Sequence, residues 1–131
     1  MFKRTIKFPD YDGNEREEDF YFNLTKAEIL EMELSTEGGI EKMVNKIIST
    51  QDRKKIIEVF KEIIQKSYGV KSDDGKRFIK NKTVLEEFIQ TEAYSILFID
   101  LATDADAAAK FIKGIMPKDL QQDSSIPASA K

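Results

Sequence analysis

The stretch DRKKIIEVFKEIIQKSYG, residues 52–69, decides the fold of this chain. Its apolar side chains recur at helical spacing and share one face: Ile56, Phe60, Ile63 and Ile64. Asp52 is suited to cap the start of this helix, and Gly69 is suited to end it in a left-handed conformation. An apolar stripe this wide, near the middle of the chain, must be covered by segments that precede it and segments that follow it in the sequence. We therefore predict a central helix in one small core, with Phe60 and Ile64 among the most buried side chains.

Composition narrows the function. The chain has 131 residues and contains neither cysteine nor histidine, so it lacks thiolate nucleophiles, the usual general base and the commonest metal ligand. Its formal charge of -3 gives no electrostatic case for nucleic-acid binding. No apolar run is long enough to span a membrane, and the first residues lack the apolar region of a signal peptide. We expect a non-enzymatic protein with no cofactor, bound metal, nucleic acid or membrane among its partners.

The first 22 residues predict a β-hairpin. Residues 2–8 and 16–22 alternate between apolar and polar side chains, and PDYDGN at 9–14 is a dense turn signal. A one-residue slip of register would turn every side chain to the other face. The apolar faces therefore match only if the loop has an odd length or a bulge adds a residue. The resulting predictions are Ile6 near Phe20, Lys7 near Asp19, and Gly13 at a positive φ.

Capping residues and helical periodicity locate the remaining elements. The first expected helix runs from the capping box Thr25–Glu28 to about Ser35 and buries Ala27, Leu30 and Leu34. Three more are expected over Ile40–Ile48, from the capping box Thr83–Glu86 to Ile89, and over Thr91–Thr103. The last expected helix begins at Thr103 or Asp104 and has an apolar stripe of Ala105, Ala108, Ala109 and Ile112. Residues 70–82 are expected to be a polar connection with a tight turn at Asp73-Asp74-Gly75. The sequence thus predicts an α+β fold, with an N-terminal β-hairpin packed on a bundle of about five helices. Residues 1–117 form the single domain, and residues 118–131 are a flexible tail.

Several clusters of polar residues could bind a ligand or catalyse a reaction, but such clusters more often have a purely structural role. Residues 10–14 resemble the start of a calcium loop but lack its later glycine and glutamate, so we interpret them as a turn. The acidic residues of 15–19 are typical of a solvated strand, and the basic residues of 76–82 of a surface loop. The carboxylate pairs at 86–87 and 104–106 do not share a helix face.

Partner binding is expected at Tyr21, Ile96 and Ile99. Each hairpin strand is expected to have a free edge, and Tyr21 should point away from the helices, on the face of Thr5 and Lys7. The segment from Thr91 to Thr103 is apolar almost all round, which favours deep burial. In the alternative, Ile96 and Ile99 lie off its main stripe and are exposed.

A series of stretches carries a family resemblance by its order and spacing. They are DYDGNE at residues 10–15, FYFNLTKAE at 20–28, EMEL at 31–34, SYG at 67–69, DG at 74–75, RF at 77–78, QTEAY at 90–94 and LATDADAAAKFI at 101–112. Over about residues 1–117, the chain resembles the tail assembly chaperones of long-tailed, non-contractile bacteriophages and related prophages.

The resemblance implies a function. Such a chaperone keeps the tape measure protein soluble and extended while tail tube subunits assemble around it. It self-associates, acts in the host bacterial cytoplasm and is absent from the mature virion. The alternatives are a small adaptor or regulatory protein that binds another phage or host protein and, least favoured, a metal-free enzyme.

Overall fold

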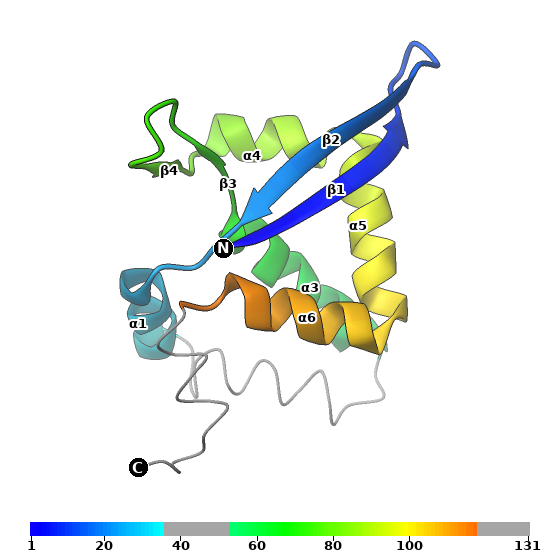
Figure 1. Cartoon of the computed structure of the whole chain (residues 1–131). Coiled ribbons are helices and arrows are strands. Elements are labelled where there is room, and N and C mark those ends of the chain that lie inside the picture. Colours follow the sequence, from blue (N-terminus) through cyan, green and yellow to red (C-terminus); the bar gives the residue numbers. More distant parts are fainter. Residues whose placement is uncertain (36–52, 118–131) are drawn as a thin grey trace.

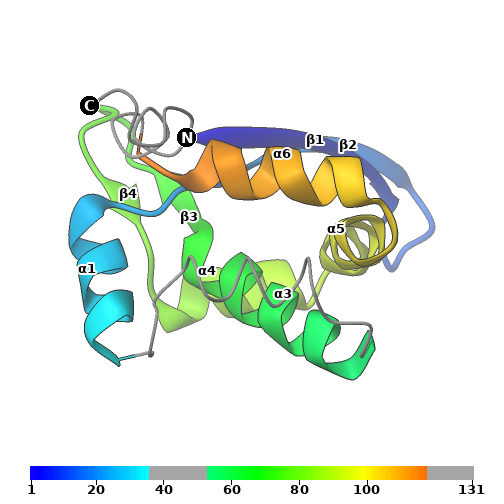
Figure 2. The ribbon, with the colours of Figure 1, turned by 90° about the horizontal axis from the view of Figure 1, so that it is seen from below.

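The computed structural model describes residues 1–35 and 53–117. In chain order the elements are β1 (Phe2–Pro9), β2 (Glu15–Phe22), α1 (Lys26–Ser35), α3 (Arg53–Ser67), β3 (Tyr68–Lys71), β4 (Phe78–Ile79), α4 (Lys82–Ile89), α5 (Glu92–Thr103) and α6 (Ala105–Ile115). The hairpin of β1 and β2 lies on one side of the helices (Figure 1, Figure 2). The predicted α+β class is therefore confirmed. The predicted helix at Ile40–Ile48, the Asp52 cap and the tail at 118–131 lie outside the described residues.

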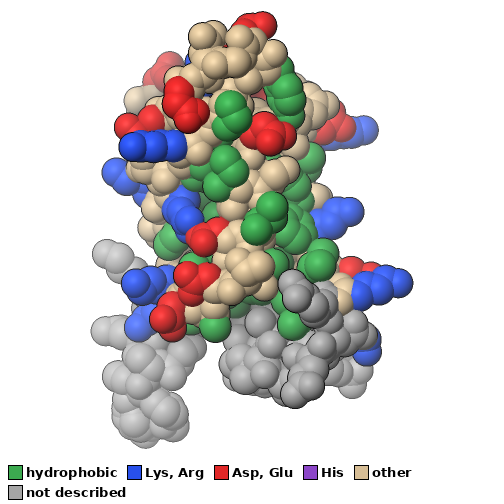
Figure 3. Space-filling view, turned by 90° about the vertical axis from the view of Figure 1, so that its right-hand side faces the viewer, with side chains coloured by type: hydrophobic (Ala, Val, Ile, Leu, Met, Phe, Trp, Pro, Cys, Tyr) green, Lys and Arg blue, Asp and Glu red, His purple; other side chains and the backbone are tan. Residues whose placement is uncertain are grey.

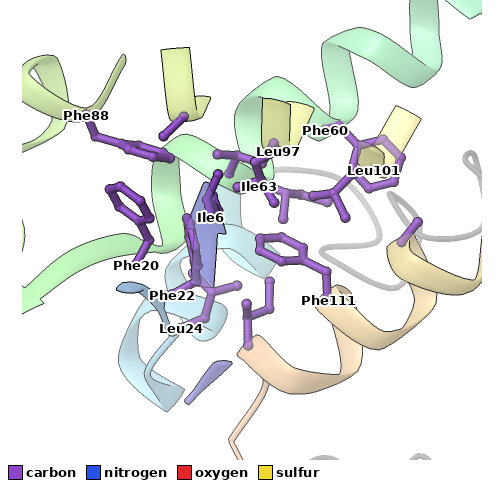
Figure 4. Close-up of a cluster of buried hydrophobic side chains, with 14 of the residues drawn as sticks. Ile6, Phe20, Phe22, Leu24, Phe60, Ile63, Phe88, Leu97, Leu101 and Phe111 are labelled. Atoms are coloured by element: carbon purple, nitrogen blue, oxygen red, sulfur yellow. The ribbon is translucent and has the colours of Figure 1, made fainter. Parts of the chain in front are cut away.

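The core joins the hairpin to the helices. Phe60 and Ile64 of α3 are 1% and 0% exposed, so the predicted central helix and its buried face are confirmed. Figure 4 shows Phe22 of β2 pointing into the same cluster as Phe88 of α4 and Phe111 of α6. The ring centroid of Phe22 is 5.9 Å from that of Phe88 and 5.3 Å from that of Phe111. Burial of these rings removes a large apolar area from water, which fixes the hairpin on the helices.

The sheet is larger than the sequence predicted. Its four strands are antiparallel in the order β1-β2-β3-β4, so the expected polar connection at 70–82 contains β4 and part of β3. The turn between them is as predicted, with Gly75 at φ +73 and its N–H donating to the Ser72 carbonyl. Gly69 does not cap the central helix. It is buried in β3, where an added Cβ would lie 2.9 Å from the Ile79 carbonyl oxygen, so close packing accounts for this glycine.

The hairpin has the predicted facing but a different register. Ile6 lies opposite Glu18 rather than Phe20, and Lys7 lies opposite Glu17 rather than Asp19. This is a two-residue shift, which leaves every side chain on the predicted face. The loop explains the shift. The Asp10 N–H donates to the Asn14 carbonyl at 2.9 Å, which leaves the odd number of residues from Tyr11 to Gly13 between the last pair, and Gly13 has the predicted positive φ of +86.

Helix α1 begins at the predicted capping box but buries a different face. The Thr25 N–H donates to Glu28 Oε1 at 2.8 Å, and the Glu28 N–H donates to Thr25 Oγ1 at 3.1 Å. Ile29 and Met32 are buried, whereas the predicted Ala27 and Leu30 are exposed; the Leu34 side chain lies outside what the structure describes. The apolar residues of this helix do not select one face. The hydrogen bonds that Lys80 Nζ donates to the Glu28 carboxylate favour the observed rotation.

Two other helix predictions need correction. Helix α4 is capped by Asn81, whose Oδ1 accepts from the Val84 N–H at 2.8 Å, so the expected box at Thr83 is wrong. Helix α6 begins at the predicted Asp104 cap, but of the predicted stripe Ala105 and Ala109 are exposed and Ile112 is half-buried. The buried residues of this helix are Ala108, Phe111 and Ile115. The larger Phe111 and Ile115 side chains gain more from burial than alanines do, so they set the rotation of the helix.

Candidate functional site

Helix α5 presents an apolar strip to solvent. Ile96 and Ile99 are 38% and 62% exposed, while Leu97 and Leu101 on the opposite side of the same helix are buried. The expectation of deep burial is wrong for these two isoleucines, and the alternative, exposure off the main stripe, is what the structure has. Figure 3 shows the face that carries α5, where hydrophobic side chains form a band with charged side chains along its margins. Exposed apolar surface with a polar border is typical of protein-binding sites.

The hairpin loop adjoins the start of α5. The Tyr11 hydroxyl donates to Glu92 Oε2 at 3.2 Å, and the Tyr11 side chain is 76% exposed. This hydrogen bond to a carboxylate raises the pKa of Tyr11 above its ordinary value. Tyr11 was not a candidate from the sequence, where it counted only as part of the turn. An aromatic residue at a turn tip, where little can cover it, is the signal that could have identified it.

Tyr21 lies inside the sheet rather than at its edge. Its neighbours Phe20 and Phe22 are buried, so its side chain points to the outer face with Thr5 and Lys7, as predicted. Its backbone, however, is paired with Lys3 on one side and with Gly69 of β3 on the other. The expected free edge is therefore wrong for this part of β2.

The ammonium group of Lys71 lies over the ring of Tyr21. Lys71 Nζ is 4.3 Å from the ring centroid, within the range of a cation–π contact. Tyr21 remains half-buried, so part of its ring is available on the outer face of the sheet. The structure thus separates Tyr21, in the sheet, from Ile96 and Ile99, which lie together on α5.

In the basic segment at 76–82, Lys80 makes structural hydrogen bonds. Lys80 Nζ donates to the carbonyl oxygens of Asn23 at 2.7 Å and Lys66 at 2.9 Å, and to the Glu28 carboxylate at 2.7 Å. Burial lowers the pKa of Lys80, and the hydrogen bond to Glu28 opposes that change. These acceptors occupy the ammonium group, which ties α1 to the end of α3. The surface-loop interpretation holds only in part, because Phe78 and Ile79 form β4, Lys82 begins α4, and Phe78 is half-buried rather than buried.

The acidic candidates also have structural roles. Asp10 Oδ1 accepts from the backbone N–H groups of Asp12 and Asn14, and Asp10 Oδ2 accepts from Arg16 Nε at 2.7 Å. The Arg16 hydrogen bond, helped by the one from Asn14, lowers the pKa of Asp10 to about 2. Asp104 caps α6 through the N–H groups of Asp106 and Ala107. Within residues 1–35 and 53–117, no group of three or more acidic side chains converges as metal ligands would.

Comparison with known proteins gives one finding. A family model described as phage tail assembly chaperone matches residues 1–129, which is further than the resemblance was expected to extend. Neither curated proteins nor solved structures give a match. None of the described helices is long and apolar enough to cross a membrane. Because the family model covers nearly the whole sequence, this chain belongs to the phage tail assembly chaperone family.

Proposed function

We propose that this chain binds the tape measure protein and keeps it soluble and extended while tail tube subunits assemble around it. The role is non-catalytic. The chain acts as a homo-oligomer in the host bacterial cytoplasm and leaves before the virion is complete. Membership of the family supports assembly of the phage tail in general. The finer assignment to the tape measure protein and the tail tube is our proposal.

One observation carries the assignment of the client surface. Ile96 and Ile99 are one helical turn apart and exposed on the same side of α5. A long helical client offers apolar side chains at the same spacing, so it can lie along such a strip with its polar side in water. Tyr21 is proposed to act separately, on the sheet surface that joins subunits. Its ring presents apolar area with a polar tip, which is a common feature of subunit interfaces.

Co-expression with the tape measure protein tests the client surface. The variant Ile99→Ser, alone and with Ile96→Ser, is expected to keep its melting temperature but to leave most of the client insoluble. Leu30→Ser is the matched control, because Leu30 is 59% exposed on α1, and this helix lies away from α5 (Figure 1). A folded double variant that keeps the client as soluble as the wild type does would show that α5 is not the client surface. Failure of the wild type to hold the tape measure protein would favour the adaptor role.

Light scattering tests the role of Tyr21. The variant Tyr21→Glu places a carboxylate beside Lys71, so the fold should tolerate it. We expect it to lower the mass of the oligomer. An unchanged mass in the folded variant would remove Tyr21 from the interface without bearing on client binding.

A further inference from the structure

Two strand edges of the hairpin lack a partner strand in the described part of the chain. The strand β1 pairs with β2 only, and β3 pairs with β2 only at Tyr21 and Phe22. One edge of β1 and the portion of β2 from Glu15 to Phe20 are therefore unpaired. An unpaired edge offers backbone N–H and C=O groups to another strand.

The register identifies which residues offer these groups. In an antiparallel pair, successive residues point their backbone groups alternately toward and away from the partner. The bond from the Asp10 N–H to Asn14 sets the alternation between β1 and β2, and the bond from the Asn23 N–H to Ser67 sets it between β2 and β3. Counting by twos from these bonds, the residues that point outward are Lys3, Thr5 and Lys7 on β1, and Glu15, Glu17 and Asp19 on β2.

The same six residues give the two edges opposite charge. All six side chains are exposed. Those on the β1 edge include two lysines, and those on the β2 edge are all acidic. Charges on an edge oppose pairing with an edge of like charge and favour pairing with one of opposite charge. Pairing of β1 with β1 or of β2 with β2 therefore places like charges together, whereas pairing of β1 with β2 places lysines beside carboxylates.

We propose that copies of this chain associate by pairing the β1 edge of one copy with the Glu15–Phe20 edge of the next. This proposal rests on the proposed self-association and adds a strand-edge contact to the sheet surface proposed for Tyr21. When two copies have the same orientation, β1 of one copy runs antiparallel to β2 of the other. The pairing therefore continues the antiparallel order of the strands in the sheet. The two edges differ, so a pair of copies keeps one unused β1 edge and one unused β2 edge. Such a contact produces a closed ring or an open filament rather than a two-fold dimer.

Charge reversal of one edge at a time tests the pairing. An acidic-edge variant carries Lys3→Glu and Lys7→Glu, and a basic-edge variant carries Glu15→Lys and Glu17→Lys. Each variant alone has two edges of similar charge. We expect the concentration needed for association to rise at least about tenfold for each. An equimolar mixture of the two should associate again, because the reversed β1 edge of one meets the reversed β2 edge of the other. Mass is measured by light scattering at low salt, where charge pairing is strongest.

One control variant and one replacement variant keep the test specific. Lys61→Glu with Lys110→Glu changes the net charge of the protein as the acidic-edge variant does, but on exposed positions of α3 and α6, and should leave association unchanged. If a charge variant fails to fold, Thr5→Pro replaces it. The Thr5 N–H points to the open edge, so proline removes a donor from that edge without breaking the ladder to β2.

Each outcome is decisive. Restored association in the mixture, with weak association of each variant alone, supports the edge pairing. Wild-type association of either folded variant alone, or a mixture that stays dissociated, overturns it. Tape measure solubility is measured on the same variants. Variants that fail to associate but still hold the client would leave the client role intact. Failure of the wild type to hold the client would show that the proposed function is wrong, whether or not the edge pairing is supported.

Discussion

Replacement of Phe22 tests how the hairpin is held on the helices. Phe22 is fully buried and contacts rings from four elements: Phe2 of β1, Tyr68 of β3, Phe88 of α4 and Phe111 of α6. The variant Phe22→Ala removes the ring from all four and leaves a cavity that they can only partly close. We expect the free energy of unfolding to fall by about 3–5 kcal/mol.

Urea and thermal unfolding measure this loss. For a chain of this length, the expected loss lowers the melting temperature by roughly 10–20 °C. The urea midpoint should fall with little change in the m-value, because the surface exposed on unfolding stays nearly the same. A second variant, Phe22→Leu, keeps much of the apolar volume and should cost roughly half as much.

Tyr11→Ala is the matched control for an aromatic residue. Tyr11 belongs to the same hairpin, but its ring is mostly exposed, and it makes a hydrogen bond to Glu92 at the surface. Its removal should change the free energy of unfolding by no more than about 0.5 kcal/mol. A loss below about 1.5 kcal/mol for Phe22→Ala, or equal losses for the two alanine variants, would refute the view that this ring joins the sheet to the helices.

Further predictions follow from individual sites. Phe60→Ala should destabilise the fold by about 3–5 kcal/mol in urea unfolding, and a loss below about 1 kcal/mol would show that α3 is not central. The Asp10 carboxyl should titrate near its lowered pKa of about 2 by NMR; its contribution to stability is present above pH 4 and is lost as the pH falls toward 2. Gly69→Ala should lower the melting temperature, because the new Cβ meets a backbone carbonyl and a phenylalanine ring; an unchanged value would contradict the close packing. Deletion of residues 118–131 should leave the melting temperature unchanged, since their polar composition predicts little burial; a clear drop would contradict the tail assignment.

The facing of the hairpin was predictable, whereas its register was not. Side chains alternate strictly along a strand, so the apolar positions Phe20 and Phe22 identify the buried face from the sequence alone. The register also depends on loop geometry. Here Asp10 binds two backbone N–H groups and the Arg16 side chain, and this network places the last pair at Asp10 and Asn14. Nothing in the spacing of apolar residues reveals a network of this kind.

The short strands were missed because their signals are weak. The strand β4 has two residues and β3 has four, which is too short for a period to appear. Gly69 was assigned to the end of a helix because glycine is common there, but the end of the helix at Ser67 involves a side chain. The Ser67 hydroxyl donates to the Ile63 carbonyl at 2.7 Å inside the core. Tertiary packing then directs the chain into β3 alongside β2.

The candidate site was predicted in part. The sequence placed Ile96 and Ile99 off the main stripe of α5, but a segment apolar on all sides gives two consistent answers, and only packing chooses between them. The pairing of Tyr21 with Gly69 depends on a strand that the sequence did not reveal. The charges of the two hairpin edges are visible in the sequence. Their meaning depends on which backbone groups point outward, and this follows only from the observed register.

The strand edge proposed to join subunits and the α5 strip proposed to bind the client are connected through β1. Arg4 lies between the outward-pointing Lys3 and Thr5, and its guanidinium forms an ion pair with Asp100 of α5. The hairpin loop reaches the other end of α5 through Tyr11. A contact that orders the β1 edge therefore also restrains the helix that carries the exposed isoleucines. In an array built by edge pairing, successive copies would present their α5 strips at a regular spacing, so one long client could bind many weak sites at once. Because linked sites raise the effective concentration of each next contact, association of the chaperone would strengthen client binding without any new contact to the client.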